Sequence, residues 1–223
     1  MAAQRVMALI GDYYHAADGI RGALEIAARQ LGLELQAFTD PALLPWDSLL
    51  GSCQGLVMAK ENRVAPAEGN AVWATPKHES AIAQFAAAGG ALIGLHNGLA
   101  SYDESGAYFQ TVRGGFQFHP REHPTFVVRA LRADHPAAAG FTPFTLKDEM
   151  YFVRVDSSRT TKLLELSNED YGASCAAWAH EVGKGRVFCF TPGHNAEVLS
   201  NPGYRGMLAS GLRWALRLAT ASR

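Results

Sequence analysis

Three histidines have the clearest potential for chemistry, because each one follows an apolar run of strand-like residues. They are His15, His96 and His194. Ligands of open parallel sheets bind beyond the carboxyl ends of the strands, so we expect these three side chains to meet at one edge of a sheet. Converging imidazoles can hold a divalent metal or act as acid and base.

Residues 94–98, with the sequence GLHNG, have the pattern of a sharp turn between a strand and a helix. Glycines two places before and after the central residue permit a strained turn that exposes that residue. Hydrolases and amidotransferases with such an elbow carry a Ser or Cys nucleophile at its centre, whereas this chain carries His96. His96 can still ligate a metal, accept a proton or donate a hydrogen bond. The competing interpretation is a buried histidine that only stabilises the turn.

A second candidate, His119, lies in the glycine-containing loop predicted over residues 114–120 and is stiffened by the following Pro120. A purely structural turn is an equally good interpretation of this loop. His123 and His135 also precede prolines, but we expect these two residues to mark loops rather than ligands.

Glu149 is the acidic residue that we favour as a partner of the histidines. It lies in the run KDEMY at residues 147–151. If this run is a strand, Asp148 and Glu149 point to opposite faces, so only one of them can enter a pocket with the histidines. A carboxylate in that pocket would orient a histidine, ligate a metal or accept a proton. The alternative is an ordinary pair of surface acids.

Several other chemistries find no support in the sequence. There is no HExxH signature, no serine at the elbow, and neither a GxGxxG nor a GxxxxGK[ST] loop. Cys53, Cys175 and Cys189 form no CxxC pair, and we expect Cys53 and Cys189 to act as small buried apolar groups.

The elements that must position these residues alternate between strands and helices in the first half of the chain. Strands are predicted at residues 6–10, 33–38, 55–59 and 91–95, helices at 16–31 and 77–88, and a short helix or turn at 45–50. This alternation predicts a parallel, doubly wound sheet with right-handed crossovers.

The second half of the chain has a different pattern. Residues 125–130 and 161–167 are strand-like, residues 176–182 and 186–190 form a predicted hairpin, and a closing helix is predicted at 204–219. We therefore expect an antiparallel extension of the sheet in the C-terminal half. Since no repeat, low-complexity tract or linker interrupts the pattern, residues 1–223 are predicted to form one domain.

Composition restricts the partners and the compartment. The chain has 223 residues, of which 48% are hydrophobic, and a formal net charge of −1. This charge argues against a nucleic-acid-binding surface, which needs clustered basic residues. No apolar run approaches the roughly 20 residues of a membrane helix, no secretion signal is evident and the cysteine count is odd. We therefore expect no membrane association and a cytoplasmic location.

Taken in order, several segments resemble the ThuA-like (trehalose utilisation) family of the class I glutamine amidotransferase-like superfamily. They are residues 94–98, 115–120, 135–140, 148–151, 178–188, 193–194 and 211–215. The resemblance implies a flavodoxin-like, three-layer doubly wound α/β fold and a role in carbohydrate utilisation, often beside sugar oxidoreductases. It also implies that the amidotransferase cysteine is replaced by His96, so glutaminase activity is not expected.

The resemblance also implies which residues form the site. By motif these are His96, His119, Glu149 and His194, with His15 matching the family's histidine after the first strand. The leading hypothesis is an enzyme that hydrolyses or isomerises a sugar or an oxidised sugar derivative. The expected substrate-binding residues are His15, Asn97, Phe116 and Tyr151, and the expected ligands of a divalent metal such as zinc are His96, His119 and His194.

Further expectations accompany this hypothesis. Because the nucleophile is missing, the chain could instead be a non-catalytic carbohydrate-binding or accessory module on an amidotransferase-like scaffold. Four aromatic residues could stack on a sugar ring, namely Tyr14, Tyr102, Phe116 and Tyr151. The closing helix or the hairpin edge offers a surface for pairing with a second copy, so a homodimer is also expected.

Overall fold

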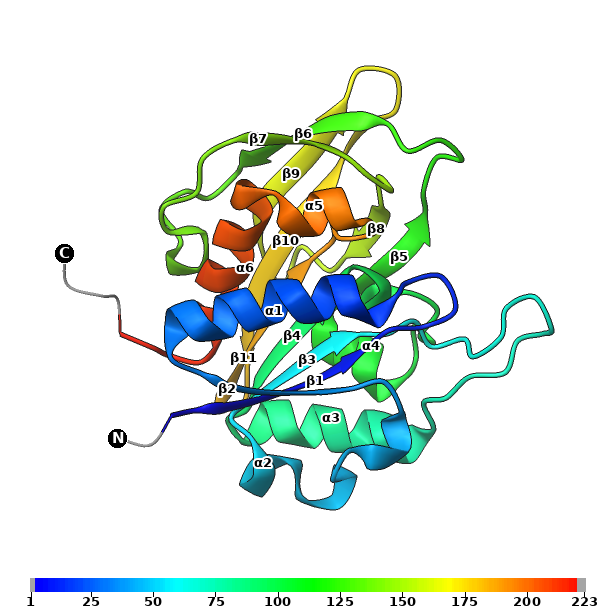
Figure 1. Cartoon of the computed structure of the whole chain (residues 1–223), viewed down its shortest axis with the longest axis vertical. Coiled ribbons are helices and arrows are strands. Elements are labelled where there is room, and N and C mark those ends of the chain that lie inside the picture. The colour runs from blue at the N-terminus through cyan, green and yellow to red at the C-terminus, as the bar shows by residue number, and fades with distance from the viewer. Residues whose placement is uncertain (1–2, 220–223) are drawn as a thin grey trace.

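One large sheet covered by helices on both faces forms the centre of the molecule (Figure 1). The structure is a computed structural model in which residues 3–219 are described. Residues 1–2 and 220–223, the two ends of the predicted domain, lie outside the described residues. The sheet has nine strands in the order β2-β1-β3-β4-β11-β10-β9-β6-β7, and a separate two-stranded sheet pairs β5 with β8.

The first half of the large sheet is parallel. Its strands are β1 (Arg5–Ile10), β2 (Glu34–Phe38), β3 (Gly55–Ala59), β4 (Ala91–Leu95) and β11 (Gly185–Phe190). Strands β3 and β4 are buried along their whole length, which explains why they are continuous apolar runs. The order β2-β1-β3-β4-β11 is that of a flavodoxin-like sheet, so the predicted fold class is confirmed.

The second half of the sheet is antiparallel, as predicted. Its strands are β10 (Gly172–Val182), β9 (Thr161–Asn168), β6 (Thr125–Ala130) and β7 (Phe144–Lys147). The hairpin of β10 and β11 joins the two halves, because β11 is parallel to β4 and antiparallel to β10. The smaller sheet consists of β5 (Gly114–Phe118) and β8 (Phe152–Val155).

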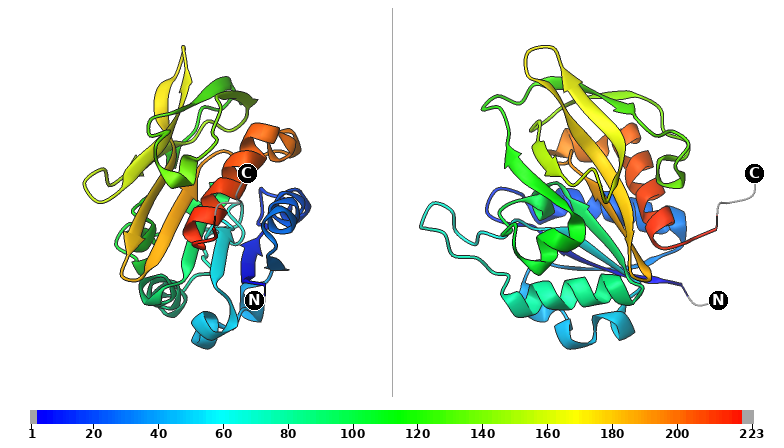
Figure 2. Two further views of the ribbon diagram at one scale, coloured as in Figure 1. Left: turned by 90° about the vertical axis from the view of Figure 1, so that its left-hand side faces the viewer. Right: turned by 180° about the vertical axis from the view of Figure 1, so that it is seen from behind.

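Helices form the two outer layers, which lie on either side of the sheet in the left panel of Figure 2. One face carries α1 (Ala17–Leu31), α5 (Ala196–Ser200) and α6 (Pro202–Ala215), and the other carries α2 (Leu49–Ser52), α3 (Pro76–Ala88) and α4 (Ala107–Val112). Short 3₁₀ turns are η1 (Pro41–Leu43), η2 (Trp46–Ser48), η3 (His96–Leu99) and η4 (Pro136–Ala138). Within residues 3–219, no helix combines the length and apolarity needed to cross a membrane.

Two segments near the site differ from their predicted structure. Residues 114–118 are strand β5 rather than part of a loop, because they pair with β8, a partner distant in sequence. Residues 148–151 are not a strand, since β7 ends at Lys147. The chain leaves the sheet there because the Asp148 carboxylate accepts hydrogen bonds from the backbone N–H groups of Gly193 and His194.

Candidate functional site

The elbow predicted around His96 is a tight turn between β4 and η3. His96 has a φ of 36°, in the left-handed region that a non-glycine residue rarely adopts. A Cβ on Gly98 would lie 1.9 Å from the carbonyl oxygen of Met58, so the turn can approach β3 only with glycine at this position. The turn places the His96 side chain, which is 2% exposed, at the carboxyl end of the sheet.

Four side chains from distant parts of the chain meet at this end of the parallel strands. They are His15, His96, Glu149 and His194, each with one ligand atom within 4.8 Å of the others. Glu149 Oε2 lies 3.2 Å from His194 Nδ1 and 3.3 Å from His96 Nε2. The distance from Glu149 Oε2 to His15 Nε2 is 4.0 Å. The three histidines that were expected to converge therefore lie around one carboxylate oxygen.

The second nitrogen of two of these histidines is already engaged. His15 Nδ1 donates to the Asp12 carboxylate at 2.7 Å, and His96 Nδ1 donates to the Thr191 carbonyl at 2.7 Å. The hydrogen bond from Nδ1 fixes the orientation of the His96 ring, so that Nε2 is directed at the cluster.

Within the described residues, three nitrogens of the cluster are buried without a hydrogen-bond partner. They are His15 Nε2, His96 Nε2 and His194 Nδ1. Buried polar atoms are nearly always satisfied, so three such atoms around one carboxylate require an explanation. Imidazole nitrogens with a carboxylate oxygen are a donor set suited to zinc and related divalent ions, and the side chains present therefore fit a metal.

Two aspartates, Asp12 and Asp148, position the residues of the cluster through hydrogen bonds. The Asp12 carboxylate, besides binding His15, accepts hydrogen bonds from the Asn97 amide at 2.6 Å and from the Glu61 backbone N–H at 2.8 Å. The Asp148 carboxylate fixes the backbone of His194. The sequence did not single out either residue as part of the site, although Asp12 lies in the same post-strand segment as His15.

Asn97, predicted to bind substrate, directs its amide group into the protein. Its Nδ2 donates to the Asp12 carboxylate and to the carbonyl of Ala59 at 2.8 Å. Asn97 is buried and joins the ends of β1, β3 and β4. Its observed contacts are therefore those of a residue that positions the elbow.

His119 and His123 lie on the outer side of Glu149. The Nε2 atoms of both lie 3.7 Å from Glu149 Oε1, and their side chains are 31% and 36% exposed. His119 lies outside the four-residue cluster, whereas His15 belongs to it. His123 was expected only to mark a loop, but the segment after β5 turns back and brings it beside Glu149. His135 instead caps η4 by accepting from the N–H of Ala137.

The aromatic residues named from the sequence differ in their accessibility. Tyr151 is buried and stacks on His96 with ring centroids 4.1 Å apart, and Phe116 packs on Tyr151 at 4.4 Å. Tyr102 is buried and donates its hydroxyl to the carbonyl of Lys60, so it cannot stack on a sugar. Tyr14 is exposed.

The electrostatics of the cluster favour ionised carboxylates. Burial alone would raise the pKa of Glu149, but the adjacent His194 and His96 outweigh it and hold that pKa well below its usual range. Burial also opposes ionisation of Asp12, but the hydrogen bond and charge of His15 hold its pKa well below its usual range. The Glu149 carboxylate in turn raises the pKa of His194.

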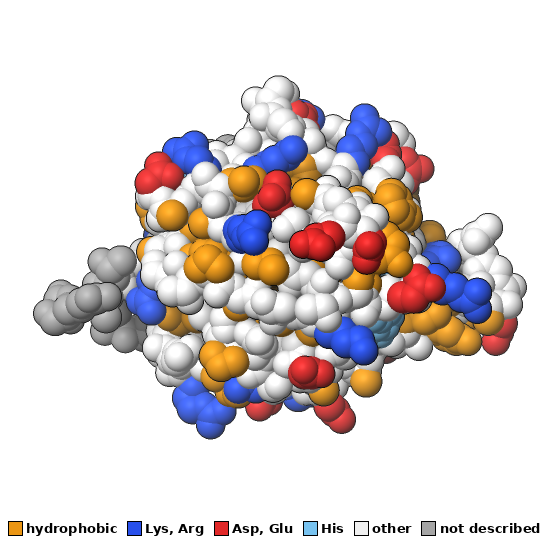
Figure 3. All heavy atoms as spheres, turned by 90° about the horizontal axis from the view of Figure 1, so that it is seen from above, with side chains coloured by type: hydrophobic (Ala, Val, Ile, Leu, Met, Phe, Trp, Pro, Cys, Tyr) orange, Lys and Arg blue, Asp and Glu red, His pale blue; other side chains and the backbone are white. Residues whose placement is uncertain are grey.

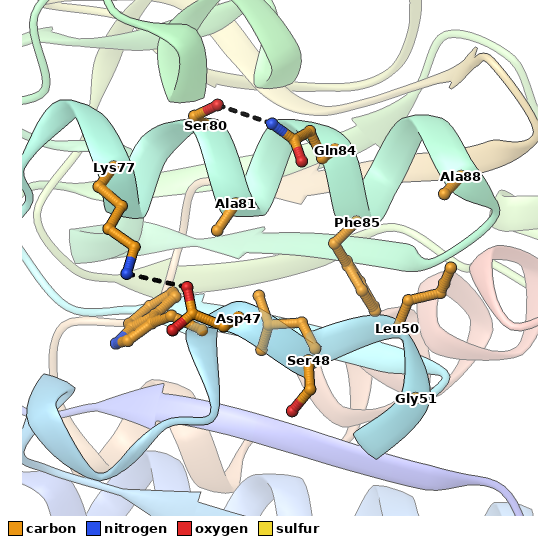
Figure 4. A pocket seen from close by; sticks show the side chains of 12 residues that line it. Asp47, Ser48, Leu50, Gly51, Lys77, Ser80, Ala81, Gln84, Phe85 and Ala88 are labelled. Carbon is orange, nitrogen blue, oxygen red and sulfur yellow. Dashed lines mark hydrogen bonds and ion pairs between the residues drawn. The ribbon is translucent and has the colours of Figure 1, made fainter.

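On the face seen in Figure 3, a small pale-blue area of histidine lies among hydrophobic and charged side chains. A groove of about 590 Å³ lies elsewhere, between α3 and the segment containing η2 and α2 (Figure 4). Asp47 and Lys77 form an ion pair of 2.9 Å across this groove. No member of the histidine cluster lines it, so the groove and the cluster are separate features.

The flavodoxin-like strand order and the elbow after β4 define a protein with the class I glutamine amidotransferase-like fold, with a histidine where that class can carry a nucleophile. The family model for ThuA, trehalose utilisation, matches residues 10–215. The chain belongs to this family.

Solved structures with the same fold include proteins with related descriptions. A putative ThuA-like protein from Parabacteroides merdae has a TM-score of 0.79 at 13% identity, covering 100% of this chain and 93% of its own. One from Bacteroides uniformis has a TM-score of 0.76 at 16% identity, covering 99% and 94%. The carbohydrate deacetylase Agd3 has a TM-score of 0.67 at 14% identity, covering 99% of this chain but 33% of its own. A comparison with curated proteins found no match.

Proposed function

We propose that this protein is an enzyme of carbohydrate utilisation that acts on a sugar or an oxidised sugar derivative at a divalent-metal site. The proposed ligands are His15, His96, Glu149 and His194. The observation that carries the proposal is the convergence on one carboxylate oxygen of three buried imidazole nitrogens that make no hydrogen bond of normal geometry.

The distances within the cluster support this proposal. A hydrogen bond from a charged nitrogen to a carboxylate is about 2.7–2.9 Å long. Two ligands that each lie about 2.1 Å from a tetrahedral ion are separated by about 3.4 Å. The separations from Glu149 Oε2 to His194 and His96, 3.2 and 3.3 Å, are close to the second value.

The chain's own residues prepare the site in two ways. Asp12 and the Thr191 carbonyl fix the rings of His15 and His96, while Asp148 fixes the backbone of His194, so the nitrogens are held in place before an ion binds. A bound divalent ion would polarise a sugar carbonyl or lower the pKa of a water molecule, which suits hydrolysis or isomerisation.

The assignment to carbohydrate is supported by the family, whose description is trehalose utilisation. One protein that shares the fold is described as a carbohydrate deacetylase. The half-buried ring of Phe116, which lies beside Tyr151 and His119, is an apolar surface against which a sugar could pack.

Elemental analysis of the purified protein tests the proposal. We expect one or more equivalents of a divalent metal in the wild type, lost in the His96→Ala and His194→Ala variants and kept in His135→Asn, which preserves an acceptor for the cap of η4. We expect both alanine variants to lose turnover of sugars in a panel assayed by mass spectrometry. A wild type without metal after supplementation, or alanine variants that retain it, would refute the metal site.

A second candidate function is a non-catalytic carbohydrate-binding or accessory module. The observation in its favour is the absence of a Ser or Cys nucleophile at the elbow, where His96 stands. Sugar binding by the metal-loaded protein without any turnover across the panel would support this candidate over the enzyme.

A further inference from the structure

The two oxygens of Glu149 face different groups of histidines. Oε2 faces the buried cluster of His15, His96 and His194, as described above. Oε1 faces His119 and His123, whose Nε2 atoms both lie 3.7 Å away. One carboxylate therefore stands between an inner set of three imidazoles and an outer set of two.

The ring of the outer histidine His119, like that of His96, is oriented by a hydrogen bond from Nδ1 to a backbone carbonyl. Its Nδ1 donates to the carbonyl of Pro120 at 2.7 Å, which orients the ring so that Nε2 faces Glu149 Oε1. The equal separations of 3.7 Å are too long for hydrogen bonds and leave room for an ion beside Glu149 Oε1, between the rings of His119 and His123, whose centroids lie 6.4 Å apart.

We propose that His119, His123 and Glu149 Oε1 form a second divalent-cation site, so that Glu149 bridges two ions. This inference rests on the proposed inner site. Two imidazoles and one carboxylate oxygen are a sufficient set of protein ligands for a catalytic zinc ion, and they leave a coordination position for water or substrate. The partial exposure of His119 and His123 directs that position to solvent.

The charges around Glu149 are consistent with two ions. Three carboxylates, those of Asp12, Asp148 and Glu149, lie at or directly beside the cluster. Two bridged ions about 3.5–4 Å apart would form a binuclear centre of the kind that stabilises attacking and leaving oxygens together.

Metal stoichiometry tests this inference without knowledge of the substrate. The protein is stripped with a chelator, titrated with Mn²⁺ and analysed for bound manganese after removal of free ion. We expect two equivalents in the wild type and one in His119→Ala, His123→Ala and His123→Asn. His135→Asn, which alters a second histidine–proline pair outside the cluster, should retain two. Electron paramagnetic resonance should show a spin-coupled pair in the wild type and an isolated ion in the outer-site variants.

The outcomes separate this inference from the proposed function. One equivalent in the wild type that is unchanged by His119→Ala and His123→Ala would overturn the second site and leave the inner site intact. Two equivalents retained by both variants would also overturn it. No bound manganese in the wild type would overturn the inner site and the outer site together. Circular dichroism of each variant establishes that the loss of an ion does not reflect unfolding.

Discussion

At the scale of single residues, His180 shows what burial does to a histidine that lacks a carboxylate partner. It lies on β10, is buried, and donates from Nε2 to the carbonyl of Thr111 at 2.9 Å. Burial, assisted by the charges of Arg113 and Arg159, lowers the pKa of His180 to about 4. His194 behaves in the opposite way, because Glu149 raises its pKa.

This difference predicts a pH dependence of stability for His180. The unfolded chain takes up a proton at this residue near pH 6.5, whereas the folded protein resists it until about pH 4. The stabilising contribution of His180 to the free energy of unfolding is therefore fully present above pH 6.5. It is lost as the pH falls towards 4, which lowers the free energy of unfolding by about 3 kcal/mol in total. Urea unfolding of the wild type and His180→Gln at pH 7 and pH 5 measures it. Equal pH dependence in the two proteins would contradict the prediction.

The sequence was sufficient to single out the three inner histidines and His119, but not His123. His15, His96 and His194 each follow a parallel strand, and the carboxyl ends of parallel strands share one edge, so their convergence follows from local patterns. The position of His123 depends on the path of the chain after β5. That path is set by pairing with β8, which no local pattern reveals.

At the scale of elements, two glycines in α6 have opposite surroundings. A Cβ on Gly206 would meet nothing within 4 Å, whereas a Cβ on Gly211 would lie 2.2 Å from the ring of Phe188, which is fully buried. Gly206 therefore costs conformational entropy on folding without any steric need for glycine, whereas Gly211 lets the helix lie directly on β11.

We therefore predict that Gly206→Ala stabilises the protein by about 0.5–1 kcal/mol, because alanine restricts the unfolded chain and favours helix. Gly211→Ala should destabilise it by about 1–3 kcal/mol, because the core must move to admit a methyl group. Thermal or urea unfolding of the two variants beside the wild type checks both signs. A loss of stability in Gly206→Ala would show that its surroundings are not open.

Element patterns explain why the fold was more predictable than the irregular segments. The apolar runs of β3 and β4 are buried on both faces, so their composition alone predicts their place in a parallel sheet. Residues 148–151 contain no such signal. Their conformation is set by hydrogen bonds from Gly193 and His194 to Asp148, which come from a distant part of the chain.

At the scale of the whole molecule, the four residues of the inner cluster are far apart in the sequence, with His15 at one end and His194 at the other. An ion bound there would be held by the folded protein and not by the unfolded chain, in which these residues are far apart. Binding therefore adds to the free energy of unfolding by mass action, by about 2.7 kcal/mol at an ion concentration of 100 Kd.

We predict that saturating Zn²⁺ or Mn²⁺ raises the Tm of the chelator-treated protein by roughly 5–10 °C, given about 2–4 °C per kcal/mol for a chain of this size. Differential scanning calorimetry measures the shift. The His96→Ala variant, which lacks a central ligand, should show much less of it. An equal shift in both proteins would indicate that the ions act elsewhere on the surface.

The position of β11 has a consequence for how the protein is made. It is the last strand of the chain, yet it lies in the middle of the sheet between β4 and β10. A ribosome delivers β4 long before β11, so the growing polypeptide exposes an unpaired apolar strand edge throughout that interval. His194 follows β11 directly, which means that a nascent chain cannot assemble the four-residue cluster before its sheet is complete. Products truncated before β11 would thus lack both the completed sheet and the four-residue cluster.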